Sequence, residues 1–349
     1  MTSAGIIEAA RRRPGMFIGG CDGQGLVHLA MEVIGNAFDQ HLLGRSDRIE
    51  VAVEPDGTIA VSDDGGGIPV DGDEGRPPLA ELLTVHRDLP TADGHRPHAH
   101  LTPTLVGVGL VVVNALCAEL EIETVHAGVC ARGRWRRGRP DGAIAATPTT
   151  APSGTRLRFT PDPEIFGDHR LDLGALLSQI DALVALRPGL VIDVRLASRR
   201  CEPHGLAARV RRVADEPADT VAAARQDVVT ADGPITVDVA LTWTHPSRAS
   251  VIDSYVNYQR SGHHGTHVDG LYDGIRRVFA GKRAAHASGL VAAVAVVLAD
   301  VHWGTPTRDR LLTPSVRKPV ADVTVAARPA WSAAHPAAAA ELRARLNAR

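Results

Sequence analysis

The chain has 349 residues, 44% hydrophobic and 22% charged, which is typical of a globular protein and suits two domains better than one small core. The formal net charge of -2 argues against a generally basic nucleic-acid-binding protein, although it is compatible with a local basic surface. Four cysteines without CxxC spacing favour a reduced, cytoplasmic protein, and the longest apolar runs, such as residues 290–301, are too short to span a membrane.

The first predicted helix lies within residues 11–42, RRRPGMFIGGCDGQGLVHLAMEVIGNAFDQHL. Its apolar residues recur at spacings of three and four, as on the buried side of an amphipathic helix: Leu26, Leu29, Ala30, Val33 and Ala37. Glu32, Asn36 and Asp39 form a second, polar stripe, because side chains at i, i+4 and i+7 lie on one face. A solvated surface is the usual explanation of such a stripe, and convergence on one bound object is the alternative.

A β-hairpin is predicted for residues 49–61, where apolar residues alternate on both sides of a turn at residues 55–57. The hairpin ends in Asp63 and Asp64, and three glycines follow. Because a run of glycines does not hold regular structure easily, we expect a tight bend there, beside a ligand or a loop.

A long loop is predicted for residues 86–104, which are polar and rich in proline, glycine and histidine. His95, His98 and His100 in this loop offer metal ligands, but a plain polar loop is the favoured interpretation. The apolar segment that follows can begin a helix at residues 107–109.

The rest of the chain alternates between strand and helix patterns. Strands are predicted at residues 119–125, 155–161 and 190–196, with a helix near 172–186. A helical, alanine-rich stretch at 202–225 is expected to close the first domain. A second α/β unit follows, with a strand at 235–243, a helix at 267–280, a buried strand at 290–301 and a final Ala- and Arg-rich helix.

Four separated pieces share one explanation: the helix with Glu32 and Asn36, the hairpin end SDDGGGIP, the loop end GVG, and GTRLRF around Thr155. Together they resemble the nucleotide-binding signature of the GHKL ATPases, which include gyrase, heat-shock chaperones and histidine kinases. RRRPGMFIGG, HHGTHVDGL and TPTRDRLL are similar to the gyrase B protein and its type II topoisomerase relatives. The resemblance implies an α+β fold, with a GHKL (Bergerat) ATP-binding α/β sandwich at residues 1–215 and a ribosomal-S5-like transducer domain at 216–349.

The polar stripe has the chemistry that a nucleotide needs. A carboxylate beside a bound nucleotide can take a proton from the water that attacks the γ-phosphate, so Glu32 is the candidate general base. An amide oxygen is a hard ligand, and Asn36 can supply one to Mg²⁺ that bridges the ATP phosphates. The stripe is therefore predicted to face Mg-ATP and not bulk water.

The resemblance implies that the hairpin end binds adenine. Asp63 would accept a hydrogen bond from the exocyclic amine of the base, and Thr155 would support that contact through a water. Gly67 and Ile68 belong to the same ATP-binding segment.

The resemblance also implies a phosphate end. Backbone N–H groups of the segment Gly107, Val108 and Gly109 are expected to cradle phosphate at a helix start. Arg308, in the second domain, is expected to reach the γ-phosphate. It stands where the family has a lysine, and arginine keeps the charge but not the geometry.

Several positions depart from the family pattern. Gly35 and Gln40 stand where typical gyrase B chains have acids, and Gly66 replaces an arginine, so one whole ion pair is expected to be missing. Residues 103–106 lack the glycines and the lysine of the family's phosphate lid, which should weaken phosphate capture. The N-terminal arm is short, and no acidic motif of the Mg-binding domain that assists DNA cleavage is found.

The favoured hypothesis is a gyrase-B-like ATPase module that closes as a homodimeric clamp on nucleotide binding. DNA topoisomerisation would then need a separate topoisomerase subunit, and DNA contact stays open. The alternative is a degenerate nucleotide sensor, decoy or gyrase-directed inhibitor without useful turnover. The arginine run at residues 132–139 is interpreted as a solvated hairpin, with DNA contact as the minority alternative.

Overall fold

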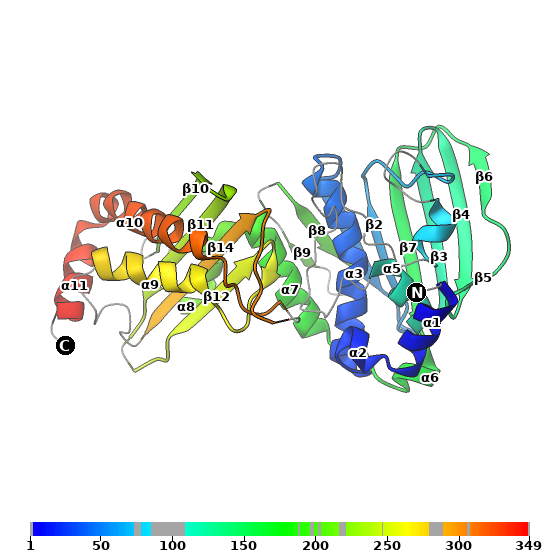
Figure 1. Ribbon diagram of the computed structural model, residues 1–349, viewed down its shortest axis with the longest axis horizontal. Helices are drawn as coiled ribbons and strands as arrows, with labels where there is room; N and C mark the ends of the chain where they lie inside the picture. Colours follow the sequence, from blue (N-terminus) through cyan, green and yellow to red (C-terminus); the bar gives the residue numbers. More distant parts are fainter. Residues whose placement is uncertain are drawn as a thin grey trace. The chain divides into compact units, whose positions relative to one another are not determined.

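The computed structural model describes residues 3–72, 78–84, 109–187, 189–195, 199–201, 204–215, 221–245, 247–278, 289–305 and 308–347. The chain divides into two compact units: unit 1 comprises residues 1–184 and 189–203, and unit 2 comprises residues 185–188 and 204–349. Each unit has its own sheet with helices packed against it (Figure 1).

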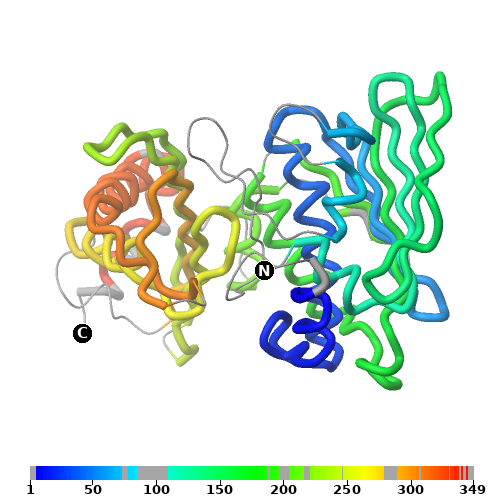
Figure 2. Tube along the Cα trace, turned by 45° about the vertical axis from the view of Figure 1, so that its right-hand side comes forward, coloured from blue at the N-terminus to red at the C-terminus, as the bar shows by residue number. Residues whose placement is uncertain are grey.

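The sheet of unit 1 contains β1 (Arg48–Val53), β2 (Ile59–Asp63), β3 (Cys117–His126), β4 (Val129–Arg136), β5 (Arg139–Pro140), β6 (Ala145–Pro148), β7 (Gly154–Pro161), β8 (Val191–Val194) and β9 (Arg199–Cys201). Its described strands lie in the order β5-β4-β3-β7-β2-β1-β8-β9, and β6 pairs with β4. The predicted hairpin is the antiparallel pair β1–β2, with Val51 opposite Val61. Because β7 pairs with both β2 and β3, segments that are far apart in the sequence lie side by side in this sheet (Figure 2).

The helices of unit 1 are α1 (Ser3–Arg12), α2 (Gly15–Ile18), α3 (Gly23–Leu42), α4 (Leu79–Leu82), α5 (Gly109–Leu116), α6 (Pro163–Phe166) and α7 (Leu173–Leu186). The Asp22 carboxylate caps α3, accepting hydrogen bonds from the N–H groups of Gln24 and Gly25 at 3.0 and 3.1 Å. Helix α3 packs on β1, β2, β7 and α5 (Figure 1). The predicted apolar stripe is buried, as expected: Leu26, Leu29, Ala30, Val33 and Ala37.

A buried carboxylate fastens α1 to the rest of unit 1. The side chain of Asp162 is 0% exposed, and its Oδ2 lies 2.7 Å from a guanidinium nitrogen of Arg11 and 3.0 Å from one of Arg137. Arg11 also donates to the carbonyl oxygen of Ala115 at 2.8 Å. The arginine at position 11 therefore has a structural role in docking the N-terminal helix.

Unit 2 contains β10 (Ala222–Thr230), β11 (Gly233–Trp243), β12 (Val251–Val256), β13 (Gln259–Arg260) and β14 (Leu290–Leu298), in the order β10-β11-β14-β12-β13. Its helices are α8 (Gly205–Ala214), α9 (Thr266–Val278), α10 (Arg317–Ala334), α11 (Pro336–Asn347) and the short 3₁₀ turn η3 (Pro314–Val316). Helices α9 and α10 pack together and bury an apolar core against the sheet, which includes Val237, Leu271 and Val320. From α8, Arg209 pairs with Asp253 of β12 at 3.0 Å.

The stretch at residues 202–225 differs from its prediction. Helix α8 ends at Ala214, and residues 222–230 form strand β10. Helix α8 packs on β11 and β14 and belongs to compact unit 2. Alanine favours helix on its own, but pairing with β11 decides the conformation of residues 222–230. Among the described helices, none is long and apolar enough to cross a membrane.

Candidate functional site

A row of polar side chains crosses the apolar face of the unit 1 sheet. Cross-strand register places Thr155 of β7 between Thr124 of β3 and Asp63 of β2. Because side chains alternate along a strand, those of Thr124, Thr155 and Asp63 point to the same face of the sheet as the apolar residues two and four positions away. Those rows consist of buried residues: Ile122, Leu157 and Val61, then Leu120, Phe159 and Ile59. The core of unit 1 therefore ends in a compact polar site.

The glycine run after β2 bends around this polar row. The Ile68 N–H donates to the Thr124 hydroxyl oxygen at 2.8 Å. Gly67 has a φ of 70°, and a Cβ atom there would lie 2.0 Å from the carbonyl oxygen of Val125. Only glycine fits such a close approach of two backbones. The tight bend predicted from the glycine run is present.

Asp63 is a desolvated carboxyl group at the end of β2. Burial raises the pKa of Asp63 to about 6, against the opposing effect of a hydrogen bond that its Oδ1 accepts from the Gly65 N–H at 2.9 Å. At pH 7 the group is therefore mostly ionised although it is largely removed from water. Carboxylates in such surroundings gather at binding sites, where a ligand's hydrogen-bond donor replaces the lost water.

Glu32 lies buried in the middle of α3, with the residue only 3% exposed. Its Oε2 accepts a hydrogen bond from the N–H of Gly109 at 3.1 Å. Since Gly109 is the first residue of α5, the carboxylate lies at the positive end of that helix. Asn36, one turn further along α3, is half-buried. The polar stripe is thus partly enclosed and does not form a plain solvated surface.

Hydrogen bonds from two side chains surround Gly66, at the position where the resemblance implied that an ion pair is missing. The Gly66 N–H donates to Gln40 Oε1 at 3.1 Å, and His126 Nδ1 lies 2.7 Å from the Gly66 carbonyl oxygen. Both backbone polar groups of Gly66 are therefore satisfied by side chains from α3 and β3.

Arg308 lies in unit 2, in the loop that precedes η3. Its backbone has a φ of 56°, which is uncommon for a residue with a side chain. The Gln259 side chain donates to the Arg308 carbonyl oxygen at 3.0 Å, and the Ser261 hydroxyl donates to that of Asp309 at 2.8 Å. These bonds fix the loop backbone within unit 2. The role of Arg308 at a γ-phosphate stays a prediction.

The predicted phosphate end is described in the structure from Gly109 onward. Gly107 and Val108 lie outside the described residues, as do the histidines of the 86–104 loop. Within the described ranges, no group of three or more His, Cys, Asp and Glu side chains is placed to hold a metal ion. The Mg²⁺ site predicted at Asn36, with the nucleotide phosphates as further ligands, stays a prediction.

The arginine-rich strand β4 is neutralised within its own sheet. Each of three arginines lies opposite a glutamate of β3, at N···O distances of 2.5, 2.5 and 3.1 Å: Arg132 with Glu123, Arg134 with Glu121, and Arg136 with Glu119. Paired, exposed charges of this kind are typical of a solvated hairpin. The geometry favours that interpretation over a DNA-binding strand.

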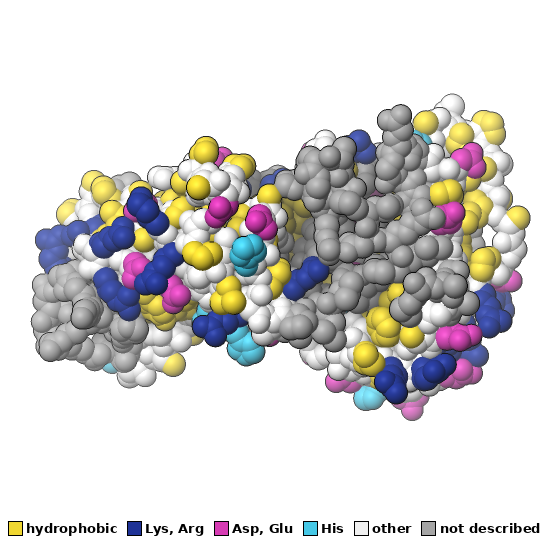
Figure 3. All heavy atoms as spheres, in the orientation of Figure 1, with side chains coloured by type: hydrophobic (Ala, Val, Ile, Leu, Met, Phe, Trp, Pro, Cys, Tyr) yellow, Lys and Arg dark blue, Asp and Glu magenta, His cyan; other side chains and the backbone are white. Residues whose placement is uncertain are grey.

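Basic side chains of unit 2 are also interleaved with acidic ones. Figure 3 shows both kinds side by side over α9 and α10. Asp273 pairs with Arg276 and Arg317, and Asp322 pairs with Arg277 and Lys318. This face therefore lacks the uniform positive charge, among its described residues, that a phosphate backbone would need.

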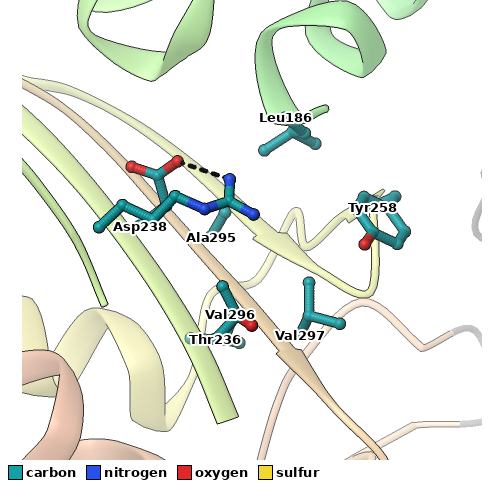
Figure 4. Close-up of a pocket in the computed structure, with 8 residues that line it drawn as sticks. Leu186, Thr236, Asp238, Tyr258, Ala295, Val296 and Val297 are labelled. Carbon is teal, nitrogen blue, oxygen red and sulfur yellow. Dashed lines mark hydrogen bonds and ion pairs between the residues drawn. The ribbon is translucent and has the colours of Figure 1, made fainter. Parts of the chain in front are cut away.

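A shallow hollow in unit 2 is a second candidate site (Figure 4). It is lined by Leu186, the last residue of α7 and part of unit 2, and by Arg225, Thr236, Asp238, Tyr258, Ala295, Val296 and Val297. Burial raises the pKa of Asp238 to about 6, while Arg225, 3.3 Å away, opposes the shift. Because these two charges already satisfy each other and the remaining lining is mainly apolar, the hollow has no set of converging polar groups for a ligand.

Three residues of the unit 1 site were not predicted from the sequence: Thr124, Gln40 as a hydrogen-bond acceptor, and His126. A signal for Thr124 was present, because alternation in ELEIETV places it on the same strand face as Leu120 and Ile122. A polar residue at the end of an apolar face is typical of a site. The other two contacts depend on the bend of the glycine run, which no sequence period encodes.

Residues 21–165 match the family model described as "Histidine kinase-, DNA gyrase B-, and HSP90-like ATPase". This region, which contains the polar row and α3, is thus an ATP-binding domain of the GHKL class. The chain as a whole is a divergent relative of the ATPase region of DNA gyrase B. It is 30% identical over 346 residues to the gyrase B protein from Haloferax lucentense, covering 91% of this chain and 53% of the relative. The chain therefore spans about half the length of the curated relatives it matches.

Solved structures confirm the mixed α+β fold. The 43K ATPase domain of Thermus thermophilus gyrase B, crystallised with an aminocoumarin, superposes with a TM-score of 0.74 at 26% identity, covering 98% of this chain and 96% of that one. The gyrase B protein from Myxococcus xanthus gives a TM-score of 0.77 at 25% identity, covering 98% and 99%.

Proposed function

We propose that this chain binds Mg-ATP in unit 1 and hydrolyses it, as a gyrase-B-like ATPase module. The observation that carries the proposal is the desolvated Asp63 carboxylate, aligned with Thr155 at the end of an apolar sheet face. At the edge of this buried face, a single ionised acceptor selects a base with an amine donor. Gly67 and Ile68 form the adjoining backbone wall.

The catalytic step needs a base near the γ-phosphate. In the proposed reaction Glu32 takes a proton from the attacking water as the oxygen–phosphorus bond forms, and ADP leaves with the electrons of the broken bond. Asn36 would hold Mg²⁺ through its amide oxygen, and the ion would neutralise phosphate charge. Gly109, with Gly107 and Val108, would hold the phosphates through backbone N–H groups. Arg308 would stabilise charge that develops at the γ-phosphate.

Assembly belongs to the same proposal. Nucleotide binding would select a closed, homodimeric clamp, and any action on DNA would require a separate topoisomerase subunit. Light scattering should then show mainly monomer without nucleotide and dimer with a non-hydrolysable ATP analogue. A stable dimer that ignores nucleotide would contradict the clamp.

A nucleotide sensor without useful turnover is the second candidate, and one contact favours it. The Gly109 N–H, which phosphate capture would use, already donates to Glu32. A carboxylate engaged at a helix start is a poorer base, because the hydrogen bond stabilises its ionised form. Steady-state ATPase measured beside equilibrium binding of a non-hydrolysable analogue separates the candidates: the enzyme needs both, whereas the sensor shows binding alone.

A further inference from the structure

The buried hydroxyl of Thr124 has no part in the chemistry proposed so far. The residue is 1% exposed, and its Oγ1 has three polar neighbours. They are the Ile68 N–H at 2.8 Å, Thr155 Oγ1 at 3.2 Å and the Gly154 carbonyl oxygen at 3.3 Å. One side chain of β3 thus joins the glycine bend after β2 to the beginning of β7.

A hydroxyl group can make only a few hydrogen bonds, so the groups that bond to Thr124 Oγ1 depend on one another. A hydroxyl has one proton and two lone pairs, and the Ile68 N–H occupies a lone pair. The proton and the other lone pair remain for Gly154 and for the Thr155 hydroxyl. In either orientation of the proton, the Thr155 hydroxyl and the Ile68 backbone are held to one oxygen atom.

The junction lies beside the residue that would recognise the base. Thr155 is directly opposite Asp63 in the β2–β7 register. The strand that carries Thr124 otherwise presents Leu120 and Ile122 to this face, so packing alone would favour another apolar residue. A buried hydroxyl lowers the free energy of the folded state only when its hydrogen bonds are made, as they are here.

We propose that Thr124 is a positioning residue for adenine recognition, holding the Thr155 hydroxyl and the Ile68 backbone at the spacing at which the Asp63 site reads the amine edge of the base. This inference rests on the proposed function of unit 1. It assigns base selectivity to a third strand, in addition to the acidic residue and threonine implied by the resemblance.

The test compares ATP with inosine triphosphate, in which a carbonyl oxygen replaces the adenine amine. Thr124→Val removes the hydroxyl at constant shape, and Thr124→Ser retains it. Thr58→Val is the matched control, because Thr58 is also fully buried and its hydroxyl lies 2.9 Å from that of Thr160, near the other end of the same strand pair. Calorimetric titration gives both affinities, and thermal unfolding reports any general loss of stability.

Thr124→Val should weaken ATP binding by about fivefold to tenfold, the equivalent of one hydrogen bond, and should weaken inosine triphosphate binding much less. The preference for ATP should return in Thr124→Ser and persist in Thr58→Val. If a folded Thr124→Val protein kept the wild-type preference for ATP over inosine triphosphate, or bound both nucleotides more weakly by the same factor, the inference would be overturned while the proposed function stayed in place. Absence of ATP binding by the wild-type chain would instead remove the proposed function, and the inference with it.

Discussion

The carboxylate of Glu32 accepts a hydrogen bond from the first residue of α5, so its substitution has a structural and a chemical consequence that need separate variants. Glu32→Gln keeps an oxygen for the Gly109 N–H but cannot take a proton from water. We expect ATP turnover to fall by roughly 10²-fold or more, with ATP affinity nearly unchanged. Steady-state ATPase and equilibrium binding measure the two quantities.

Glu32→Ala is the matched comparison. It also leaves the Gly109 N–H without its carboxylate, so the free energy of unfolding should fall by about 1 to 3 kcal/mol in addition to the loss of turnover. Equal ATPase rates for wild type and Glu32→Gln, with contaminating activity excluded, would reject Glu32 as the base and favour the sensor.

At the scale of single residues, the motifs located the polar side chains but not the contacts between them. Glu32, Asp63 and Thr155 follow from residue type and position in recognisable segments. The pairing of Glu32 with Gly109 depends on how α3 meets α5, which are separated by 77 positions at this contact. Thr124 stood in an alternating strand, but only cross-strand register shows that it lies beside Thr155.

Among the secondary-structure elements, α1 depends on one buried carboxylate. Asp162→Asn should destabilise unit 1 by about 3 kcal/mol, because it leaves the Arg11 guanidinium, only 22% exposed, without its buried ionic partner and with only the longer contact to the exposed Glu164. Urea unfolding measures this change. Glu164→Gln is the control: Glu164 contacts the same arginines but is 61% exposed, so its loss should cost under about 1 kcal/mol. Similar effects of the two substitutions would contradict the anchoring role.

Elements with a strong local period were predicted well. The apolar stripe of α3 and the alternation in the β1–β2 hairpin match what the structure buries and pairs. The prediction was wrong for residues 222–225, where a helix-favouring composition was overruled by pairing with β11. Strand formation there depends on residues outside the segment, so local propensity could not reveal it.

In the whole molecule, His267 links pH to the stability of unit 2. The residue is 0% exposed, and neither ring nitrogen has a hydrogen-bond partner among the described residues. Burial lowers the pKa of His267 to about 3, with a further contribution from His264. In the unfolded chain a histidine binds its proton near pH 6.5, so unfolding takes up a proton between these values. Stability should therefore fall as pH decreases through 6.5.

The free energy of unfolding should be about 2 kcal/mol lower at pH 5 than at pH 8. Because His267 stays neutral in the folded protein over this range, the size of the change is set by the pKa of the histidine in the unfolded chain. Scanning calorimetry of wild type and His267→Gln at both pH values isolates it. Asp238 acts in the opposite direction, since its native pKa near 6 lies above the unfolded value. For that reason the difference between the two proteins is the quantity to compare. An identical pH dependence in both would contradict the assignment.

Adenine recognition by Asp63 is the central claim, and calorimetric titration with ATP and Mg²⁺ at pH 7.5 tests it most directly. The wild-type chain should bind one ATP, and Asp63→Asn should bind it about 10- to 100-fold more weakly, because an amide can present a donor where an acceptor is needed. In the wild-type chain, the affinity for ATP should also fall relative to the affinity for inosine triphosphate as the pH drops below 6, where Asp63 becomes protonated. Unchanged ATP affinity in a folded Asp63→Asn protein would contradict the account.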